Sequence, residues 1–233
     1  EDVATIARVL HAKTLGNPFF LARYLTQLHD DGIIRFDPQR CRWCWQDDEI
    51  QSLSLADNVV DLLSARIRQF PPETVQLLML ASLLGARFRL DALAAVAAVP
   101  VATCHARLCF ALADGLLVGL NDLAPDEDDP LVLTAAQFRF SHDRIQQAAR
   151  ELAEIAFTDL ACTRLGMGRA LLALERQQGR DEASFDIAEH LNAGRQCVTD
   201  PAEQLAWAQL NLELGRKAKL SSAYRTAWQN LAA

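Results

Sequence analysis

The chain has 233 residues and a formal net charge of −7 at pH 7; 51% of its side chains are hydrophobic and only 7% are aromatic. This length allows one or two domains with cores of their own, and the abundance of alanine and leucine favours helices packed on helices. Nucleic-acid-binding domains are usually basic on at least one face. Because this chain is acidic and contains no lysine- and arginine-rich run of five or more, we expect no direct contact with nucleic acid.

The sequence contains no stretch of eighteen apolar residues and no signal peptide. Its most apolar region, around residues 77–84, is followed by Gly85 and Arg87. We therefore expect a cytoplasmic protein that makes no contact with a membrane. The chain lacks an initiator methionine, and its last residues still follow a helical pattern, so we expect both ends to be cut from a larger protein.

The first part of the chain predicts two helices followed by a β-hairpin. The helices lie between Asp2 and Gly32 and meet at Gly16-Asn-Pro18, because the residue before a proline disfavours helix and proline is common at a helix start. Residues 33–36 and 42–45 predict two strands around a turn at residues 37–40.

The predicted hairpin carries two tryptophans and a Cys-x-x-Cys pair. Alternation places Trp43 and Trp45 on one face, and burial statistics favour a core position over a ligand platform. Cys41 and Cys44 have no second cysteine pair or histidine cluster with them, so we expect ordinary thiols rather than a metal site. The other cysteines lie on apolar faces of predicted helices, where we expect them to be reduced and buried. They are Cys104, Cys109, Cys162 and Cys197.

Between the hairpin and residue 144, the pattern predicts a winged-helix domain. The expected helices cover residues 55–69, 75–84, 88–98 and 103–114, and the expected strands cover residues 116–120 and 132–140. Three short helices, a strand, a loop and a strand are typical of winged helices. The helix that would enter a DNA groove is mostly apolar, and the loop after Asn121 is acidic, so phosphates would repel it. We therefore expect this domain to contact protein or nucleotide.

From Ile145 onward the chain predicts only helices, with breaks near residues 179–181, 194 and 200–201. Segments such as His190-Leu-Asn-Ala-Gly194 are similar to the helix pairs of a TPR-like superhelix. An irregular helical bundle stays open as the alternative, because the segment holds too few repeats to test a period.

The sequence shows no catalytic motif. It has no phosphate-binding G-x-x-x-x-G-K-[ST] loop, no G-x-G-x-x-G and no strand that ends in paired acids. Acidic pairs such as Asp47-Asp48 lie in loops, where solvated charge is the simpler explanation. No candidate for a Ser/His/Asp triad carries the local sequence that such a triad requires. We expect no catalytic residue and no metal site in this chain alone.

The segment Lys13-Thr-Leu-Gly-Asn-Pro-Phe-Phe-Leu21, followed by Leu28-His-Asp-Asp-Gly-Ile-Ile34, resembles the lid subdomain of the STAND class of signal-transduction ATPases. In that family a glycine-x-proline turn packs against the adenine of the nucleotide. The resemblance implies that Pro18 contacts adenine through its flat apolar ring, while Gly16 and Asn17 shape the turn. The alternative is a helix-breaking Asn-Pro without further function.

A second motif, Ser141-His-Asp-Arg-Ile-Gln-Gln-Ala-Ala149, stands where an apolar strand gives way to an amphipathic helix, whose free N–H groups can bind phosphate. It resembles the Met-His-Asp motif of plant resistance and apoptotic STAND proteins, whose histidine touches the β-phosphate of ADP. The resemblance implies that His142 senses phosphate and that Asp143 supports it or caps the helix, although Ser141 replaces the methionine. The alternative is an aspartate cap beside a core histidine.

The resemblance spans nearly the whole chain and extends to large bacterial sensor proteins. Those proteins join a serine/threonine-kinase-like domain, a STAND ATPase, a TPR-like helical region, GAF or PAS sensors and often a histidine kinase. The implied fold is mainly α: a helical lid with a small β-hairpin at residues 1–52, a winged-helix domain at residues 53–144 and the start of a TPR-like superhelix at residues 145–233.

The implied function is that of the regulatory and transmission part of a nucleotide-gated signal-transduction ATPase. ADP or ATP, with magnesium, would be held by an upstream P-loop core of the same protein, and sensor or kinase domains would follow downstream. Protein partners would bind the helical region, and the whole protein would be an ATPase, with protein or histidine kinase activity as a further option. The alternative is a helical interaction scaffold, or a fragment of a transcriptional regulator, that binds no nucleotide.

Overall fold

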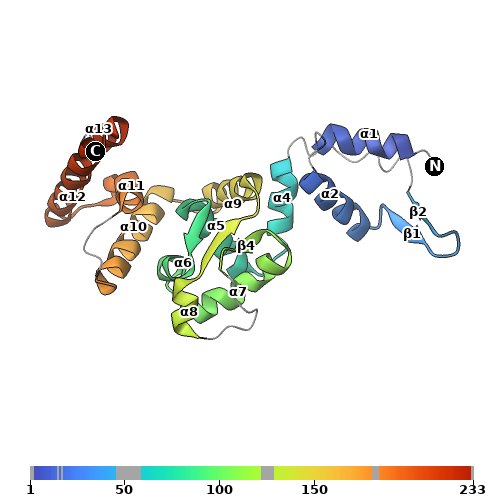
Figure 1. Ribbon diagram of the computed structural model, residues 1–233, viewed down its shortest axis with the longest axis horizontal. Helices are drawn as coiled ribbons and strands as arrows, with labels where there is room; N and C mark the ends of the chain where they lie inside the picture. Colours follow the sequence, from blue (N-terminus) through green and yellow to red (C-terminus); the bar gives the residue numbers. More distant parts are fainter. Residues whose placement is uncertain are drawn as a thin grey trace. The chain divides into compact units, whose positions relative to one another are not determined.

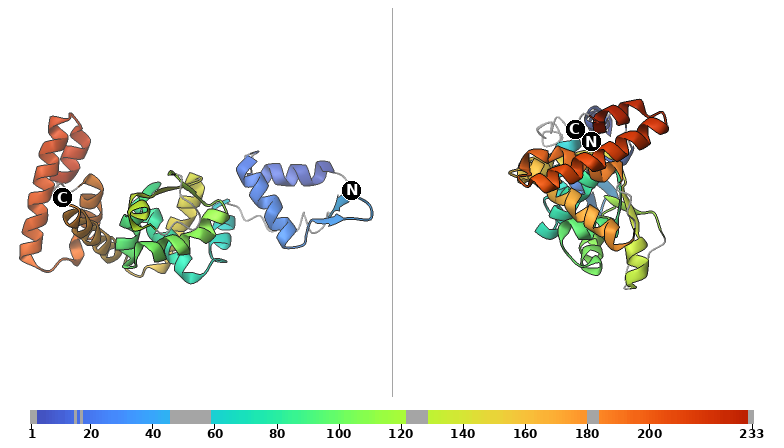
Figure 2. Two further views of the ribbon diagram at one scale, coloured as in Figure 1. Left: turned by 60° about the horizontal axis from the view of Figure 1, so that its bottom comes forward. Right: turned by 90° about the vertical axis from the view of Figure 1, so that its left-hand side faces the viewer.

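The computed structural model describes residues 3–14, 16, 18–45, 59–121, 129–179 and 184–231. It is mainly helical and contains two small antiparallel sheets, as the sequence predicted (Figures 1 and 2). The chain divides into two compact units, Glu1–Arg66 and Ile67–Ala233. The predicted domain limit at residue 52 lies outside the described residues, and the division into three domains stays a prediction.

The first unit pairs two helices with a β-hairpin. Its elements are α1 (Val3–Thr14), α2 (Pro18–Asp30), β1 (Arg35–Asp37) and β2 (Arg42–Cys44). Gly32, with φ +71°, turns the chain out of α2 and donates its N–H to the carbonyl of His29, as glycine commonly does after a helix. The Asp37 carboxylate accepts from the backbone N–H groups of Gln39 and Arg40 and so closes the hairpin turn. The buried residues of this unit's apolar cluster are Ile6, Leu10, Tyr24, Leu28 and Ile34.

The prediction that both hairpin tryptophans lie in the core is wrong for Trp43, which is 49% exposed. Trp43 pairs with Phe36 across the hairpin, and the two rings meet edge to face with centroids 5.5 Å apart. Trp45 is partly buried against the apolar cluster. Both tryptophans line the same apolar groove of this unit, and the indole of Trp43 stays partly in water there. The neighbouring Cys41 and Cys44 are free thiols.

The second unit contains a three-stranded antiparallel sheet within a group of helices. Helix α4 (Val59–Ile67) ends at the limit between the two units. The elements that follow are α5 (Pro72–Leu84), β3 (Arg87–Arg89), α6 (Leu90–Ala97), α7 (Val101–Ala113), β4 (Leu117–Gly119), α8 (Pro130–Ala135) and β5 (Gln137–Phe140). The strand order is β3-β5-β4, and Phe88 stands opposite Phe138 with their rings stacked 6.1 Å apart. The name winged helix stays an interpretation of this arrangement, and the acidic residues 122–128 lie outside the described part of the chain.

Two predicted elements of this region are wrong. The helix expected over residues 88–98 begins only at Leu90, because Phe88 is in a strand that buries its ring against Phe138. The strand expected over residues 132–140 begins at Gln137 and is preceded by α8. The carboxylate of Asp129 accepts from the N–H of Leu131 at 2.9 Å, and with the following proline it gives the start of a helix.

Helices α6 and α7 are short and apolar, and the chain bends by 106° between them. Ala98 has a left-handed φ of +52° and ends α6. Burial raises the pKa of the Cys104 thiol on α7 to about 12. Across the described residues, no single helix has both the length and the apolar composition to cross a membrane, and α6 and α7 meet that test only as a bent pair.

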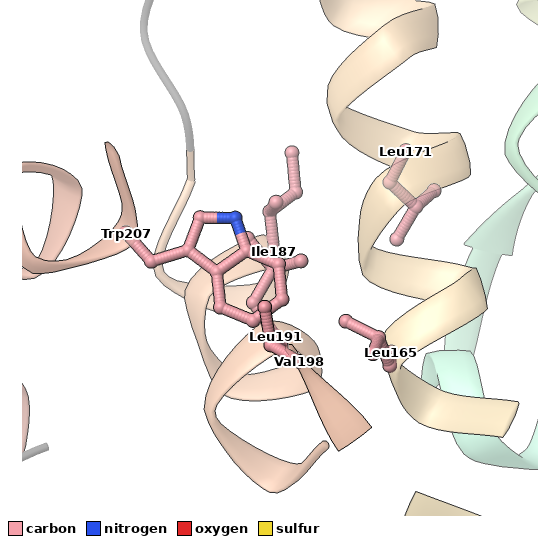
Figure 3. Packing of buried hydrophobic residues seen from close by; sticks show 6 residues of the cluster. All are labelled: Leu165, Leu171, Ile187, Leu191, Val198 and Trp207. Atoms are coloured by element: carbon pink, nitrogen blue, oxygen red, sulfur yellow. The ribbon is translucent and has the colours of Figure 1, made fainter. Parts of the chain in front are cut away.

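The described residues from 143 onward are mainly helical, in agreement with the helices predicted from Ile145 onward. The elements are α9 (Asp143–Ala156), α10 (Leu160–Gln177), α11 (Phe185–Ala193), the 3-10 helix η1 (Arg195–Cys197), α12 (Pro201–Leu220) and α13 (Tyr224–Leu231). Apolar side chains of α10, α11 and α12 meet in one cluster, in which Trp207 of α12 packs with Leu191 and Val198 (Figure 3). Whether these helices belong to a TPR-like superhelix stays a prediction.

Helices α10 and α11 approach each other closely because glycine occupies two contact positions. A Cβ on Gly168 would lie 2.7 Å from a side-chain carbon of Leu191, and a Cβ on Gly194 would lie 2.5 Å from Cβ of Leu165. Real Cβ atoms do not come that close to their neighbours, so only glycine permits this spacing.

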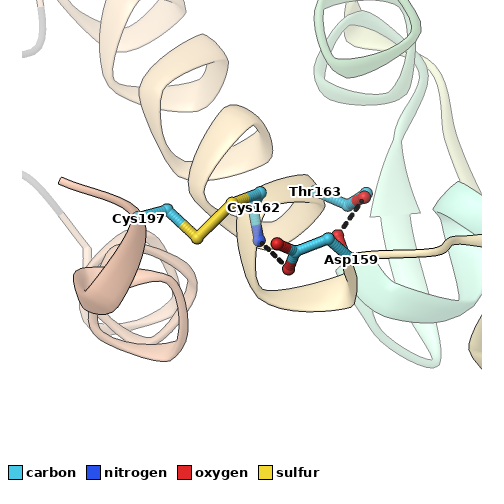
Figure 4. Close-up of a disulfide and its surroundings, with 4 residues drawn as sticks. All are labelled: Asp159, Cys162, Thr163 and Cys197. Atoms are coloured by element: carbon cyan, nitrogen blue, oxygen red, sulfur yellow. Dashed lines mark hydrogen bonds between the residues drawn. A yellow bond between two sulfur atoms is a disulfide. The ribbon is translucent and has the colours of Figure 1, made fainter.

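The expectation that all helical cysteines are reduced is wrong, because Cys162 of α10 and Cys197 of η1 form a disulfide (Figure 4). Their Cα atoms are 5.7 Å apart, and 35 positions separate them in the sequence. Spacing along a single chain does not reveal such a pairing, because the partners meet only after α11 has folded back onto α10.

Candidate functional site

The turn predicted to contact adenine lies between α1 and α2 of the first unit. Gly16 has φ +76°, which favours glycine, and a Cβ at this position would lie 3.4 Å from Nε2 of His11. Pro18 is exposed at the first position of α2, where its missing N–H costs no hydrogen bond. Asn17 lies outside the described residues. The glycine and the proline are therefore placed as the sequence predicted, while their contact with a nucleotide stays a prediction.

His142 and Asp143 lie at the joint between β5 and α9 in the second unit. His142 is the N-cap of α9, and its Nδ1 accepts from the N–H of Arg144 at 3.1 Å. The same Nδ1 lies 2.5 Å from a carboxylate oxygen of Asp143, which itself accepts from the N–H of Arg144 at 2.9 Å. The side chains of His142 and Asp143 are 31% and 83% exposed. The histidine is therefore neither a core residue nor remote from the helix cap.

The two contacts of Nδ1 require different states of that nitrogen, one without and one with a hydrogen. An unprotonated Nδ1 can accept from the Arg144 N–H, and a protonated Nδ1 can donate to the Asp143 carboxylate. In the second state the Asp143 oxygen is already in place to accept from the same N–H. The start of α9 is thus capped in both states, by His142 in one and by Asp143 in the other.

Hydrogen bonds hold this joint to neighbouring helices of the same unit. The Ser141 hydroxyl donates to the carbonyl of Gly115 at 2.7 Å, just beyond the end of α7. The Gln146 amide donates to the carbonyl of Ser82 in α5 at 3.2 Å. The Gln146 side chain therefore ties the start of α9 to α5 within the second unit.

Sequence reasoning missed a partly buried ionic cluster that joins the sheet to α10. Arg89 of β3 donates to both carboxylate oxygens of Asp91, and its second terminal nitrogen donates to Glu175 of α10 at 3.1 Å. Gln178 at the end of α10 accepts from Arg89 and donates to Asp91, each at 2.9 Å. The hydrogen bond to Asp91 is the main cause that raises the pKa of Arg89. Because the partners are more than eighty residues apart in sequence, no local pattern could have indicated the cluster.

The first unit also has an apolar groove of about 810 Å³ between its two helices and the hairpin. Its lining comes from α1, α2 and β2, and includes His29 and the exposed indole of Trp43, which meet edge to face at 5.7 Å. Arg42 is the one cationic side chain among its lining residues. The turn at Gly16 and Pro18 is not part of this lining.

The chain is similar to a hybrid signal transduction histidine kinase G from Dictyostelium discoideum, with 26% identity over 262 aligned residues. The alignment covers 96% of this chain and 8% of the relative, so the chain spans a small part of that protein's length. No protein-family model matches the chain. No solved structure matches it either.

Proposed function

We propose that this chain is the regulatory and transmission part of a larger signal-transduction protein that switches between ADP-bound and ATP-bound forms. The similarity to a hybrid signal transduction histidine kinase supports the signalling role. The observation that carries the nucleotide role is the partly exposed imidazole of His142, whose Nδ1 lies between a backbone N–H and a carboxylate. Such an arrangement can change its hydrogen bonds when an anion binds nearby.

In this proposal the β-phosphate of ADP approaches His142. A phosphate beside the imidazole favours the protonated ring, because opposite charges attract. The protonated Nδ1 then donates a hydrogen bond to the Asp143 carboxylate. This carboxylate in turn accepts from the Arg144 N–H and caps α9. Loss of the phosphate reverses the exchange, so the nucleotide state determines which side chain caps the helix.

The change at the cap is passed to other helices through the hydrogen bonds of the second unit. Gln146 links α9 to α5, and Arg89 with Glu175 links β3 to α10. To shift the population almost completely from one arrangement to the other, the nucleotide must bind the two arrangements with free energies that differ by about 5.5 kcal/mol. Several phosphate and adenine contacts together would supply this difference, with Pro18 as the adenine contact in the first unit.

The remaining parts of the nucleotide site belong, in this proposal, to an upstream P-loop core of the same protein, which holds the nucleotide and magnesium. Sensor or kinase domains of the same protein receive the signal. ATP hydrolysis and kinase activity are then properties of the whole protein, because the chain itself has no phosphate-binding glycine loop.

The test is calorimetry of ADP and ATP with the natural protein that carries this chain together with a P-loop core. We expect His142→Ala and Pro18→Ala to weaken ADP binding about tenfold, or about 1.4 kcal/mol each. Pro130→Ala is the matched control for the proline, because Pro130 also opens a helix on the surface. His29→Ala is the control for the loss of an exposed histidine.

His142→Asn separates phosphate sensing from helix capping. Asparagine is a good N-cap residue but carries no imidazole, so we expect this variant to keep the stability of α9 and to lose ADP affinity. Unchanged ADP affinity in His142→Asn and in Pro18→Ala would contradict the nucleotide role. The chain would then be a helical interaction scaffold, a function favoured by the exposed apolar side chains Leu205 and Leu212 on α12 and Trp228 on α13.

A further inference from the structure

The disulfide of the second unit lies at the base of the α10–α11 pair. Cys162 is in the first turn of α10, whose N-cap Asp159 accepts from the Cys162 N–H at 2.9 Å (Figure 4). Thr163 donates its hydroxyl to the Asp159 carbonyl at 2.9 Å and reinforces the same turn. Cys197 ends η1, the short helix that leads from α11 toward α12. The bond therefore connects the start of one helix to the segment that enters another.

Packing brings the two cysteines together independently of the bond between them. A Cβ on Gly194 would overlap the carbonyl oxygen of Ala161, which shows how closely the two backbones approach. The N–H of Cys197 donates to the Gly194 carbonyl at 2.9 Å, and Val198 packs in one apolar cluster with Leu165 (Figure 3). Reduction removes none of these contacts, so the two thiols stay within reach of each other.

The pair is also open to reagents from solution. Cys162 is exposed and Cys197 is half-buried, whereas the buried Cys104 has a pKa raised to about 12 and is protected from the same reagents. A thiolate at position 162 would lie in the first turn of a helix, where the dipole favours negative charge and the nearby Asp159 carboxylate opposes it. Exposed disulfides of this kind are those that exchange with small thiols.

We propose that Cys162 and Cys197 are a reversible redox modification site, which exchanges with a thiol–disulfide couple of the glutathione type. In oxidation, one cysteine thiolate attacks the small disulfide, forms a mixed disulfide and releases one small thiol. The second cysteine thiolate then attacks the protein sulfur of the mixed disulfide and releases the second small thiol. Two electrons pass from the protein thiols to the small disulfide, and the two cysteine protons end on the two small thiols.

The oxidised pair fixes the entry of α12 relative to α10. Helix α10 is joined to the sheet through Glu175 and Arg89, and α12 begins at Pro201, four positions after Cys197. Oxidation therefore makes the connection from the sheet through α10 to α12 more rigid, and reduction makes this connection more flexible. This inference goes beyond the nucleotide switch and does not depend on it.

The experiment equilibrates the 233-residue chain with glutathione at a series of reduced-to-oxidised ratios, followed by acid quench, alkylation and peptide mass measurement. We expect the Cys162–Cys197 cross-link to form and disappear reversibly across the series. The melting temperature of the oxidised form should exceed that of the reduced form by on the order of 10 °C, from closing a loop of about 35 residues. Cys197→Ser should melt like the reduced wild type at every ratio.

Cys109→Ser is the matched control, because Cys109 is also half-buried but is a free thiol on α7, and this variant should behave like the wild type. The proposal is overturned if the two thiols stay free in excess oxidised glutathione, or if the bond resists excess dithiothreitol in the folded chain. It is also overturned if reduced wild type retains one equivalent of Zn²⁺ that Cys197→Ser does not. The ligand atoms of Asp159, Cys162 and Cys197 lie within 4.8 Å of one another, so zinc is the rival occupant of the same residues.

Discussion

His190 of α11 is a buried histidine with 5% of its surface exposed, and its Nδ1 has no hydrogen-bond partner among the residues that the structure describes. Burial lowers its pKa below the ordinary value of 6.5, and the positive charge of Arg164 on α10 lowers it further. Glu189 and Asp186 on its own helix act in the opposite direction but do not reverse the shift. The imidazole is therefore neutral in the folded chain at a pH where it is already protonated in the unfolded chain.

The free energy of unfolding should fall as the pH drops below 6.5, because the unfolded chain then binds a proton that folded His190 does not. Above that pH both states are neutral and His190 contributes no pH dependence. The slope from this group is at most about 1.4 kcal/mol per pH unit. Urea unfolding of wild type and His190→Gln, measured on both sides of this pH, gives the free energy of unfolding as a function of pH. We expect this free energy to depend less on pH in the variant. The exposed His29→Gln variant is the control, and equal slopes in wild type and His190→Gln would refute the assignment.

At the scale of elements, two glycines of α10 should respond oppositely to the same substitution. Gly168→Ala places a methyl group 2.7 Å from Leu191 and should destabilise the chain by about 1–3 kcal/mol. Gly166→Ala, two residues earlier in the same helix, meets no atom within 4 Å and should stabilise it by about 1 kcal/mol, because alanine is the better helix former. Chemical denaturation of both variants measures the two signs. A stabilising Gly168→Ala would show that α10 and α11 are not packed as closely as described.

Apolar periodicity was sufficient to predict most helices, including the break at Gly16 and the joint between β5 and α9. It failed where a competing signal was short: the apolar residues at 131–133 suit a strand, but Asp129 and Pro130 start a helix. The break between α9 and α10 was also missed, although Asp159 is an N-cap there. The disulfide and the Arg89 cluster could not be predicted, because each joins residues far apart in sequence.

As with the fold, only part of the candidate site could be predicted from the sequence. The position of His142 at a helix start followed from the local pattern, since strand and helix periodicities meet there. Its role as the N-cap did not follow, because the sequence favoured Asp143 for the cap and the geometry places both side chains on one N–H. Which of the two prevails depends on protonation, which a residue pattern does not record.

At the scale of the whole molecule, the Arg89 cluster should contribute more to the free energy of unfolding than an exposed ion pair of similar geometry. Asp91 has 2% of its side chain exposed, and Asp91→Asn should cost about 1.5–3 kcal/mol because it removes the carboxylate charge to which Arg89 donates through two nitrogens. Arg169 and Glu203 form two hydrogen bonds of 2.7 Å at the surface, and Glu203→Gln should cost at most about 1 kcal/mol after solvent screening.

Urea unfolding at low and high salt distinguishes the two ion pairs. Added salt should reduce the cost of Glu203→Gln and leave the cost of Asp91→Asn nearly unchanged, because buried charges are poorly screened. Equal costs for the two variants would mean that the Arg89 cluster does not hold the sheet to α10. The sheet and α10 would then be held together by apolar packing alone.

The half-exposed indole of Trp43 gives the first unit a built-in optical reporter. Trp207 is buried in the second unit, so its emission is shielded from water, while Trp43 lies open on the wall of the apolar groove. Any molecule that fills the groove displaces water from this ring, which shifts its fluorescence to shorter wavelength and protects it from a dissolved quencher. With Trp45 and Trp228 replaced by phenylalanine, occupancy of the groove could be followed by light alone, without a label.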